Sequence, residues 1–152
     1  MTFLLEAMRE HLIAEGLVRK PTVAGALPPL WLEPRLGTPA PGEGNNATAV
    51  SPDLVIGAEA SGGVLSQRYQ GFFRFDGVEF TIRARTAPLA LTFESNLRAL
   101  INDVRQVMWG DLLIIESLQF RPLQPLGRDE QSYDWNTEYL IQTWQPGAPD
   151  AP

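Results

Sequence analysis

The sequence of 152 residues contains no cysteine, one histidine and one lysine, and each scarcity removes a class of chemistry. Without cysteine, the chain has no disulfides, thiolate nucleophiles or cysteine-based metal sites. His11 is expected on the flank of a helix beside Leu12, so a Ser–His–acid triad and a histidine-based metal site are both disfavoured. We therefore predict no catalytic residue, no cofactor and no metal.

Long apolar runs and basic runs are also missing. Nothing approaches the ~20 apolar residues of a membrane span, and MTFLLEAMREHL at the start has too many charges for a signal peptide. The formal net charge is −6, and the positive residues are scattered. Without a long apolar run, we expect no membrane insertion. A protein that binds nucleic acid needs a basic face, so we also expect no specific DNA binding.

The length predicts one domain spanning residues 1–152. Residues 37–52 (GTPAPGEGNNATAVSP) are rich in Gly, Pro and Asn and predict a long loop, because the pieces on either side are too small to fold alone. Residues 146–152 (PGAPDAP) predict an extended C-terminal tail.

Apolar periodicity predicts two helices. The first covers residues 2–16, with Thr2 as its N-cap and Gly16 just past its end. The second covers residues 92–109, with Thr92 as its N-cap and Glu94 in its first turn, where the helix dipole favours an acid.

Alternation and turn residues predict the strands. Asp76-Gly77 predicts a tight type I′ turn between two β-rich runs, and Gly62-Gly63 predicts another turn. The predicted strands cover residues 30–33, 53–60, 64–75, 78–85, 112–121 and 132–144, and residues 122–131 predict a turn-rich connection. Together these elements predict an α+β fold in two layers, with a mostly antiparallel sheet and both helices on one face.

The acidic residues between 129 and 138 and the glycines between 57 and 71 are expected to have structural and not catalytic roles. Asp129 and Glu130 are adjacent in a turn, and Asp134 and Glu138 alternate onto the wet face of a strand, so a glycosidase-like pair is disfavoured. The glycines between 57 and 71 lack a strand–glycine–helix phosphate fingerprint.

Aromatic residues occur on both faces of the predicted strands. Phe73 and Phe75 alternate with Phe72 and Arg74, and Trp144 lies on the opposite face from Tyr139. A small sheet with helices on one side cannot cover all of these rings. We therefore expect some of them to contact a neighbouring chain, where Trp, Tyr and Arg concentrate.

Three segments in this order resemble the tail terminator proteins of long-tailed bacteriophages, also called tail completion, neck or minor capsid proteins. They are the first helix with its short strand, the strand VEFTIRART followed by TFESNLRALINDVRQVM, and PLQPLGRDEQSYDWNTEYLI. The likeness spans residues 2–144 and lies in pattern and order, since no signature motif is present. The long 37–52 loop and the extra strand after it depart from the pattern.

The resemblance implies a structural virion protein without catalytic residues. Such proteins form hexameric rings that cap the tail tube, end its polymerisation and meet the head–tail connector protein, while genomic DNA passes through the lumen. By this analogy, we expect the subunit and tube contacts to include Arg83, Arg85, Arg128, Asp129, Glu130, Tyr133 and Trp135.

Two alternatives remain open. One is a head-completion or connector-adaptor protein of the phage neck, although the strand-rich middle of this chain argues against it. The other is a small ligand-binding or hydrolytic α+β domain, which needs a pocket with convergent polar groups.

Overall fold

The computed structural model describes residues 4–33, 38–41, 53–68, 71–128 and 132–146, without the side chains of residues 61–72, 145 and 146. These residues form α1 (Leu4–Ala14), β1 (Leu30–Leu32), β2 (Leu54–Arg68), β3 (Gly71–Ala84), α2 (Ala87–Ile101), β4 (Val104–Trp109), β5 (Leu112–Arg128) and β6 (Tyr133–Pro146). The fold is α+β, as the sequence predicts.

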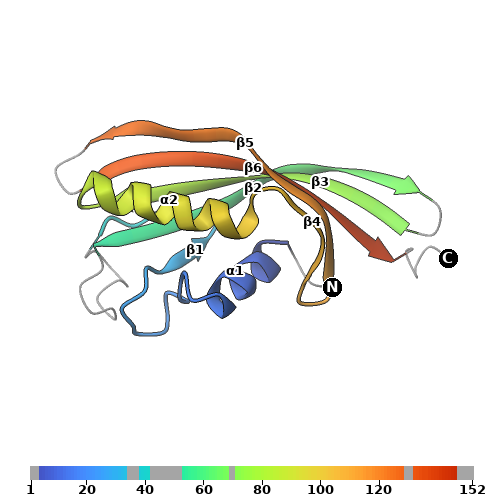
Figure 1. The fold of residues 1–152 in the computed structure, drawn as a ribbon, viewed down its shortest axis with the longest axis horizontal. Coiled ribbons are helices and arrows are strands. Elements are labelled where there is room, and N and C mark those ends of the chain that lie inside the picture. Colours follow the sequence, from blue (N-terminus) through green and yellow to red (C-terminus); the bar gives the residue numbers. More distant parts are fainter. Residues whose placement is uncertain (1–3, 34–37, 42–52, 69–70, 129–131, 147–152) are drawn as a thin grey trace.

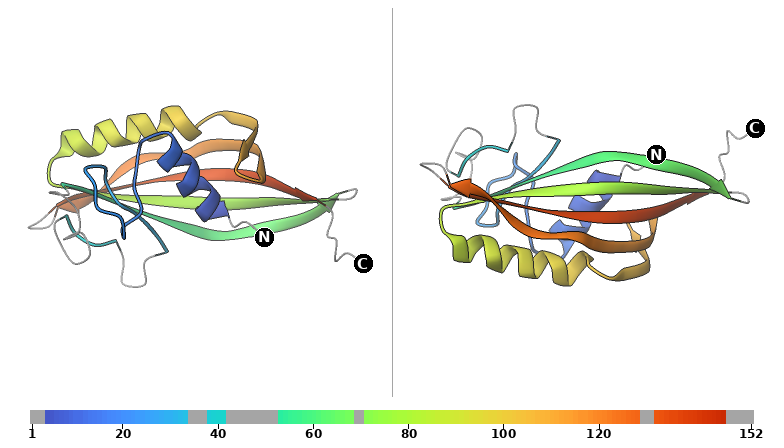
Figure 2. Two further views of the ribbon diagram at one scale, coloured as in Figure 1. Left: turned by 90° about the horizontal axis from the view of Figure 1, so that it is seen from below. Right: turned by 90° about the horizontal axis from the view of Figure 1, so that it is seen from above.

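All six strands belong to one strongly twisted sheet in the order β1-β2-β3-β6-β5-β4. Only β1 runs parallel to its neighbour β2, and every other pair is antiparallel. The central strands β3 and β6 pair along their whole length, from Gly71 opposite Pro146 to Ala84 opposite Tyr133. Figures 1 and 2 show that the ends of β2, β3 and β6 extend together beyond both helices.

Both helices pack on the same face of the sheet, which confirms the predicted two layers (Figures 1 and 2). On β3, Val78, Phe80 and Ile82 alternate with polar residues and are fully buried against this layer. Each such side chain contributes about 1.5–3 kcal/mol on burial. The helices contribute Leu5, Ala7, Met8 and Leu12 from α1, and Ala90, Phe93, Leu97 and Ile101 from α2.

The end of α1 confirms the role predicted for Gly16. Its backbone has a positive φ of 76°, which a glycine adopts without strain. The Gly16 amide donates to the Ile13 carbonyl, and the Leu17 amide to the Leu12 carbonyl, both at 3.0 Å. This is a Schellman motif, which satisfies two terminal carbonyls of the helix. The predicted N-cap, Thr2, lies outside the described residues.

The turns predicted at Asp76-Gly77 and Gly62-Gly63 are wrong. Asp76 and Gly77 lie within β3, opposite Ile141 and Leu140 of β6. β2 continues through Gly63 to Arg68, and the pairing register shifts between Ala60 and Gly63. A bulge absorbs the glycine pair without reversing the chain. Pairing with a neighbouring strand on each side therefore outweighs the local turn preference of both dipeptides.

The helix predicted over residues 92–109 is also wrong in its bounds. α2 begins at Ala87, with extended Thr86 as its N-cap and a proline in its first turn, and it ends at Ile101. Asp103 then adopts a positive φ of 55°, and residues 104–109 form β4. The apolar spacing of this segment fits a helix, but its β-branched and aromatic residues favour a strand. Glu94 consequently lies in the middle of α2, where it is buried.

The connection predicted over residues 122–131 is wrong as far as Arg128, because β5 continues to that residue. Four register shifts between Ile114 and Gly127 accommodate this strand against β6. Within the described residues, β4 pairs with β5 only up to Ser117, so the rest of β5 has a free edge where Pro122 and Pro125 are tolerated. Most of the predicted 37–52 loop and 146–152 tail, and Asp129 and Glu130, lie outside the described residues.

Neither described helix is long and apolar enough to cross a membrane.

Candidate functional site

The sheet face that points away from the helices is covered at one end. There, Arg83 donates from Nη1 to the Thr38 carbonyl at 2.7 Å, which anchors residues 38–41 over β2 and β3. Gly57 makes room for this segment, because a Cβ at that position would collide with the Thr38 side chain. Val55 and Ala40 are buried beside it. The contact explains why this part of β2 carries a glycine.

The predicted contact residues that the structure describes come together at this end of the sheet. Arg83 lies opposite Asp134, and Tyr133 lies between Ala84 of β3 and Arg128 of β5. The last residues of β3 and the first of β6 therefore bring these residues to one end of the sheet. Arg83 lies on the uncovered face, whereas Tyr133, Trp135 and Arg128 are in register with the helix-facing Ala84 and Ile82. Residues more than forty positions apart meet here because β3 and β6 are antiparallel neighbours.

Two of these residues already have partners within the chain. The Arg83 side chain is 18% exposed, and its Nε donates to Asp134 at 3.1 Å. Ser132 donates to the same Asp134 oxygen at 2.7 Å, so the carboxylate is held by two donors. Trp135 packs against the core opposite Ile82 and Pro125. Both residues have a structural role in the subunit.

Arg128 and Tyr133 form the more accessible part of this region. The guanidinium carbon of Arg128 lies 4.8 Å from the centre of the Tyr133 ring, which is a cation–π geometry. Arg128 is exposed and has no carboxylate partner among the described residues. Arg85 is also exposed and pairs with Asp53 at 3.2 Å. Exposed pairs of this kind contribute little to stability, so their charges remain accessible to a partner.

The other end of the uncovered face carries a row of apolar side chains that crosses four strands. Phe73 of β3 lies opposite Trp144 of β6, Trp144 lies opposite Leu113 of β5, and Leu113 lies opposite Met108 of β4. We call these four residues the apolar row. Met108 is 56% exposed, and the other three side chains are half-buried.

Neighbouring positions enlarge the apolar row. Phe75 is adjacent on β3, and Leu140 of β6 lies opposite both Gly77 and Leu118. Leu140 is exposed, and Gly77 beside it offers no side chain to cover it. Exposed apolar residues are normal when they are scattered. Apolar side chains at directly opposed positions on adjacent strands form a contiguous patch, and such a patch is typical of an interaction surface.

The sequence identified only part of this surface. It placed Phe73, Phe75 and Trp144 on strands and predicted that aromatic rings would remain uncovered. The pairing of Leu113 with Trp144 and of Met108 with Leu113 was missed, because the segment containing Met108 was assigned to a helix. The signal that could have found them is the β-branched and aromatic content of VRQVMW, which favours a strand over a helix.

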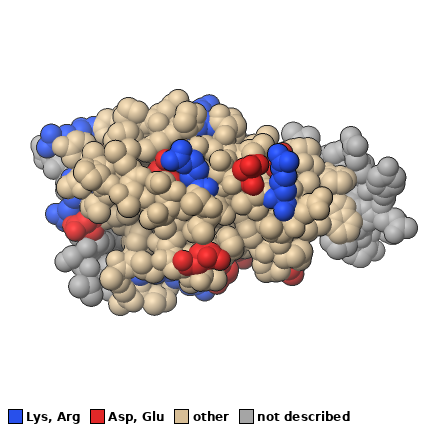
Figure 3. Space-filling view, viewed as in Figure 1, with Lys and Arg blue, Asp and Glu red and all other residues tan. Residues whose placement is uncertain are grey.

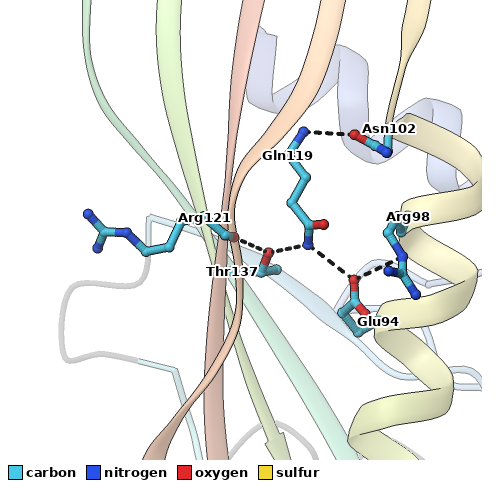
Figure 4. A network of polar contacts seen from close by, with 6 residues as sticks. All are labelled: Glu94, Arg98, Asn102, Gln119, Arg121 and Thr137. Carbon is cyan, nitrogen blue, oxygen red and sulfur yellow. Dashed lines mark hydrogen bonds and ion pairs between the residues drawn. The ribbon is translucent and has the colours of Figure 1, made fainter.

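A buried polar network fixes α2 to the sheet (Figure 4). The side-chain amide of Gln119 donates to the Thr137 hydroxyl at 2.7 Å and to Glu94 at 3.2 Å. Thr137 in turn donates to the Arg121 carbonyl at 2.9 Å. Asn102 accepts from the Gln119 backbone amide at 2.8 Å, where the pairing of β4 with β5 has ended. These hydrogen bonds give the buried polar side chains their partners and fix the position of α2 on the sheet.

Tyr139 lies fully buried near this network. Burial raises the pKa of its hydroxyl far above the ordinary value, and the charge of Glu94 raises this pKa further. Its ring meets Phe80 edge-on at 5.8 Å between centroids. The hydroxyl has no hydrogen-bond partner among the described residues. Tyr139 therefore acts as a neutral core aromatic across the physiological pH range.

No group of acidic or histidine side chains in the described residues is arranged to hold a metal ion. His11 stacks on Trp109 with ring centroids 5.2 Å apart, which gives it a packing role. An open hollow of about 490 Å³ lies between α1 and the β4–β5 turn, and its Lys20 and Glu10 pair at 3.3 Å. On the face drawn in Figure 3, positive and negative residues lie in small separate groups without a basic patch.

The chain matches no protein-family model. It also matches no curated protein sequence.

Proposed function

We propose that this chain is a structural virion protein that forms a ring on the tail tube of a long-tailed bacteriophage. The ring ends tube polymerisation and joins the tail to the head connector, as in the tail terminator proteins that the sequence resembles. The observation that carries the proposal is the uncovered sheet face with its apolar row, since a water-exposed patch of this kind favours assembly.

Two further observations support an assembly role. The α+β fold in two layers is the fold that the resemblance implies. The acidic net charge of −6 suits a lumen wall past which DNA must move without sticking. Partners in this proposal are further copies of the chain, the tail tube protein and the connector protein, and the place of action is the virion.

The first experiment is native mass spectrometry with negative-stain imaging, at several concentrations and beside purified tail tubes. Hexameric rings, or binding to tube ends, would support the proposal. Binding to isolated connectors but not to tubes would favour the connector-adaptor alternative. A chain that stays monomeric and ignores both would return attention to the hollow beside α1 and to a ligand screen.

Arg128→Glu tests the predicted contact region. The variant should keep its fold, because Arg128 is exposed and its guanidinium lies over the Tyr133 ring without an ion pair to a described carboxylate. Assembly on tubes should be damaged, because charge reversal at a subunit contact creates repulsion. Lys20→Glu is the matched control, since Lys20 is half-exposed on the α1 side of the molecule. An unfolded Arg128→Glu variant, or one that assembles normally, would remove this region from the interface.

A further inference from the structure

The free edge of β5 carries two further exposed apolar side chains outside the apolar row. Phe120 lies between Gln119 and Arg121, and Leu126 between Pro125 and Gly127, at two of the register shifts against β6. Their side chains are 51% and 57% exposed. A bulge re-aims the side chain that it carries. We call Phe120 and Leu126 the bulge pair.

Leu126 lies too far from the apolar row to cover it within one chain, whereas Phe120 is nearer, beside Tyr139 and Glu138 of β6. The row crosses β6 at Trp144, whereas Leu126 lies beside Trp135 and Asp134. Nine residues of strand separate these positions, which corresponds to about 30 Å. β4, which includes Met108, is the edge strand next to β5, and the C-terminal end of β5 lies away from it at the other end of the sheet (Figure 1). The apolar row and the bulge pair both remain open to solvent in the single chain.

We propose that the bulge pair of one subunit packs on the apolar row of the next copy of the chain. This inference rests on the proposed ring and names the two surfaces that form it. A two-fold dimer needs one self-complementary patch, whereas a closed ring needs two different patches on each subunit. The chain offers two different sets of apolar side chains, a row across four strands and two exposed residues on the edge of β5.

The charges beside the two patches are complementary. Glu116 follows the apolar row along β5 and pairs with Arg105 at 3.1 Å. Asp103 lies 3.5 Å from the same guanidinium, so two carboxylates share one arginine and leave a net negative charge there. The bulge pair is flanked by Arg121 and Arg128 on β5. Arg121 pairs with Glu138 at 3.7 Å, the longest ion pair among the described residues, so its guanidinium is weakly held. Opposite charge at the rim sets the register of an interface.

The edge itself indicates packing by side chains and not by strand addition. Within the described residues, β5 beyond Ser117 has no strand on its outer side. Pro122 and Pro125 cannot donate a backbone hydrogen bond, and the bulges distort the edge. A neighbouring copy is therefore expected to meet Phe120 and Leu126 through a surface, and the apolar row is a sheet face of that kind.

Cysteine cross-linking tests the inference, because the chain has no cysteine of its own. A Met108→Cys, Leu126→Cys double variant is treated with a short bismaleimide, which cannot span about 30 Å within one chain. The expected result is a ladder of covalent species above the dimer that ends in one closed oligomer. An equal mixture of the two single variants should give dimers only, and each single variant alone should stay monomeric.

Val23→Cys with Leu126→Cys is the matched control. Val23 is 53% exposed, close to the exposure of Met108, and it lies in neither patch. This pair should remain uncross-linked at the same concentrations. All the replaced side chains are more than half exposed, so the variants should keep the far-ultraviolet circular dichroism of the original chain.

Two outcomes would overturn the inference. Cross-linking of Met108→Cys alone would mean that the row packs on the row of a second copy, as in a two-fold dimer. A double variant that stays monomeric would mean that the two patches do not meet. Without cross-linker, Met108→Glu should weaken self-association by about tenfold or more, and unchanged association would count against the row.

The proposed function can fail separately from this interface. A closed covalent ladder without any binding to tail tubes would keep the interface and reject the terminator role. Binding of the chain to tube ends without the ladder would keep the role and reject these two patches.

Discussion

Replacing Thr137 by valine removes one hydroxyl from the contact between α2 and the sheet while keeping the side-chain shape. Thr137 is fully buried and donates to the Arg121 carbonyl while it accepts from Gln119. Each net hydrogen bond contributes about 1 kcal/mol, and a buried group left unpaired costs about 1–3 kcal/mol. Thr137→Val is therefore expected to lower the free energy of unfolding by about 2–3 kcal/mol.

Ser117 provides the control on the adjacent strand. It is also fully buried on the helix-facing side, opposite Ile141, but its hydroxyl has no hydrogen-bond partner among the described residues. Ser117→Ala removes a polar atom that contributes no bond. The free energy of unfolding should change by less than about 0.5 kcal/mol or should rise slightly.

Urea unfolding followed by tryptophan fluorescence and circular dichroism measures both variants. In a domain of this size, 1 kcal/mol corresponds to about 2–4 °C in Tm, so thermal unfolding gives an independent value. The reasoning would be refuted if Ser117→Ala cost as much as Thr137→Val. It would also fail if Thr137→Val were neutral, because the network of Gln119, Glu94 and Thr137 would then not hold the helix layer.

Three further predictions concern single positions. Arg19→Ala should destabilise the chain by about 2–4 kcal/mol and speed hydrogen exchange in residues 20–29, because its guanidinium bonds the carbonyls of Lys20, Val23 and Leu27. Gly57→Ala should cost about 1–3 kcal/mol in urea unfolding through the clash with Thr38, and adding Thr38→Ala should restore part of the loss. Tyr139→Phe should be nearly neutral at pH 7. Because its folded pKa is raised, Tyr139 binds its proton more tightly in the folded state, so stability should fall above about pH 10, and less steeply in the variant.

The sequence predicts the fold class correctly because its strongest patterns are periodic and local. The alternation of Val78, Phe80 and Ile82 and the stripe of α1 are features that burial on one face requires. Gly16 is similarly readable, since a helix end that needs a positive φ favours glycine. These features depend on a few neighbouring residues, so no knowledge of the tertiary pairing is needed.

The wrong predictions share a physical reason, which is that pairing with a distant strand overrides local preference. Asp76-Gly77 would form a turn in isolation, but in the chain each residue pairs with β6. Asp76 is nearly fully buried there and accepts from Arg74 at 2.8 Å, two residues earlier. An arginine on the same face at this spacing is the compensation that makes a buried aspartate tolerable in a strand.

The candidate site was predicted in its polar part more readily than in its apolar part. Arg83, Arg128 and Tyr133 were grouped through the family resemblance, and the strands predicted over residues 78–85 and 132–144 overlap β3 and β6 at Arg83 and Tyr133. The apolar row needs the register of four strands, and one of those strands, β4, was assigned to a helix. The apolar row forms only when the four strands are aligned in this register. It therefore cannot be predicted from the sequence of any single strand.

The distribution of residues over the two faces of the sheet is the strongest argument for assembly. One face forms the core with both helices, and the covered end of the other face is polar and held by Arg83 and Asp134. At the remaining end, Phe73, Trp144 and Met108 lie on the face that points away from the helices. Charged residues at these positions would not disturb the core. Polar side chains there would keep a single chain soluble. Apolar side chains at those positions contribute most to stability when a second surface covers them, which is the role proposed for the bulge pair of a neighbouring copy.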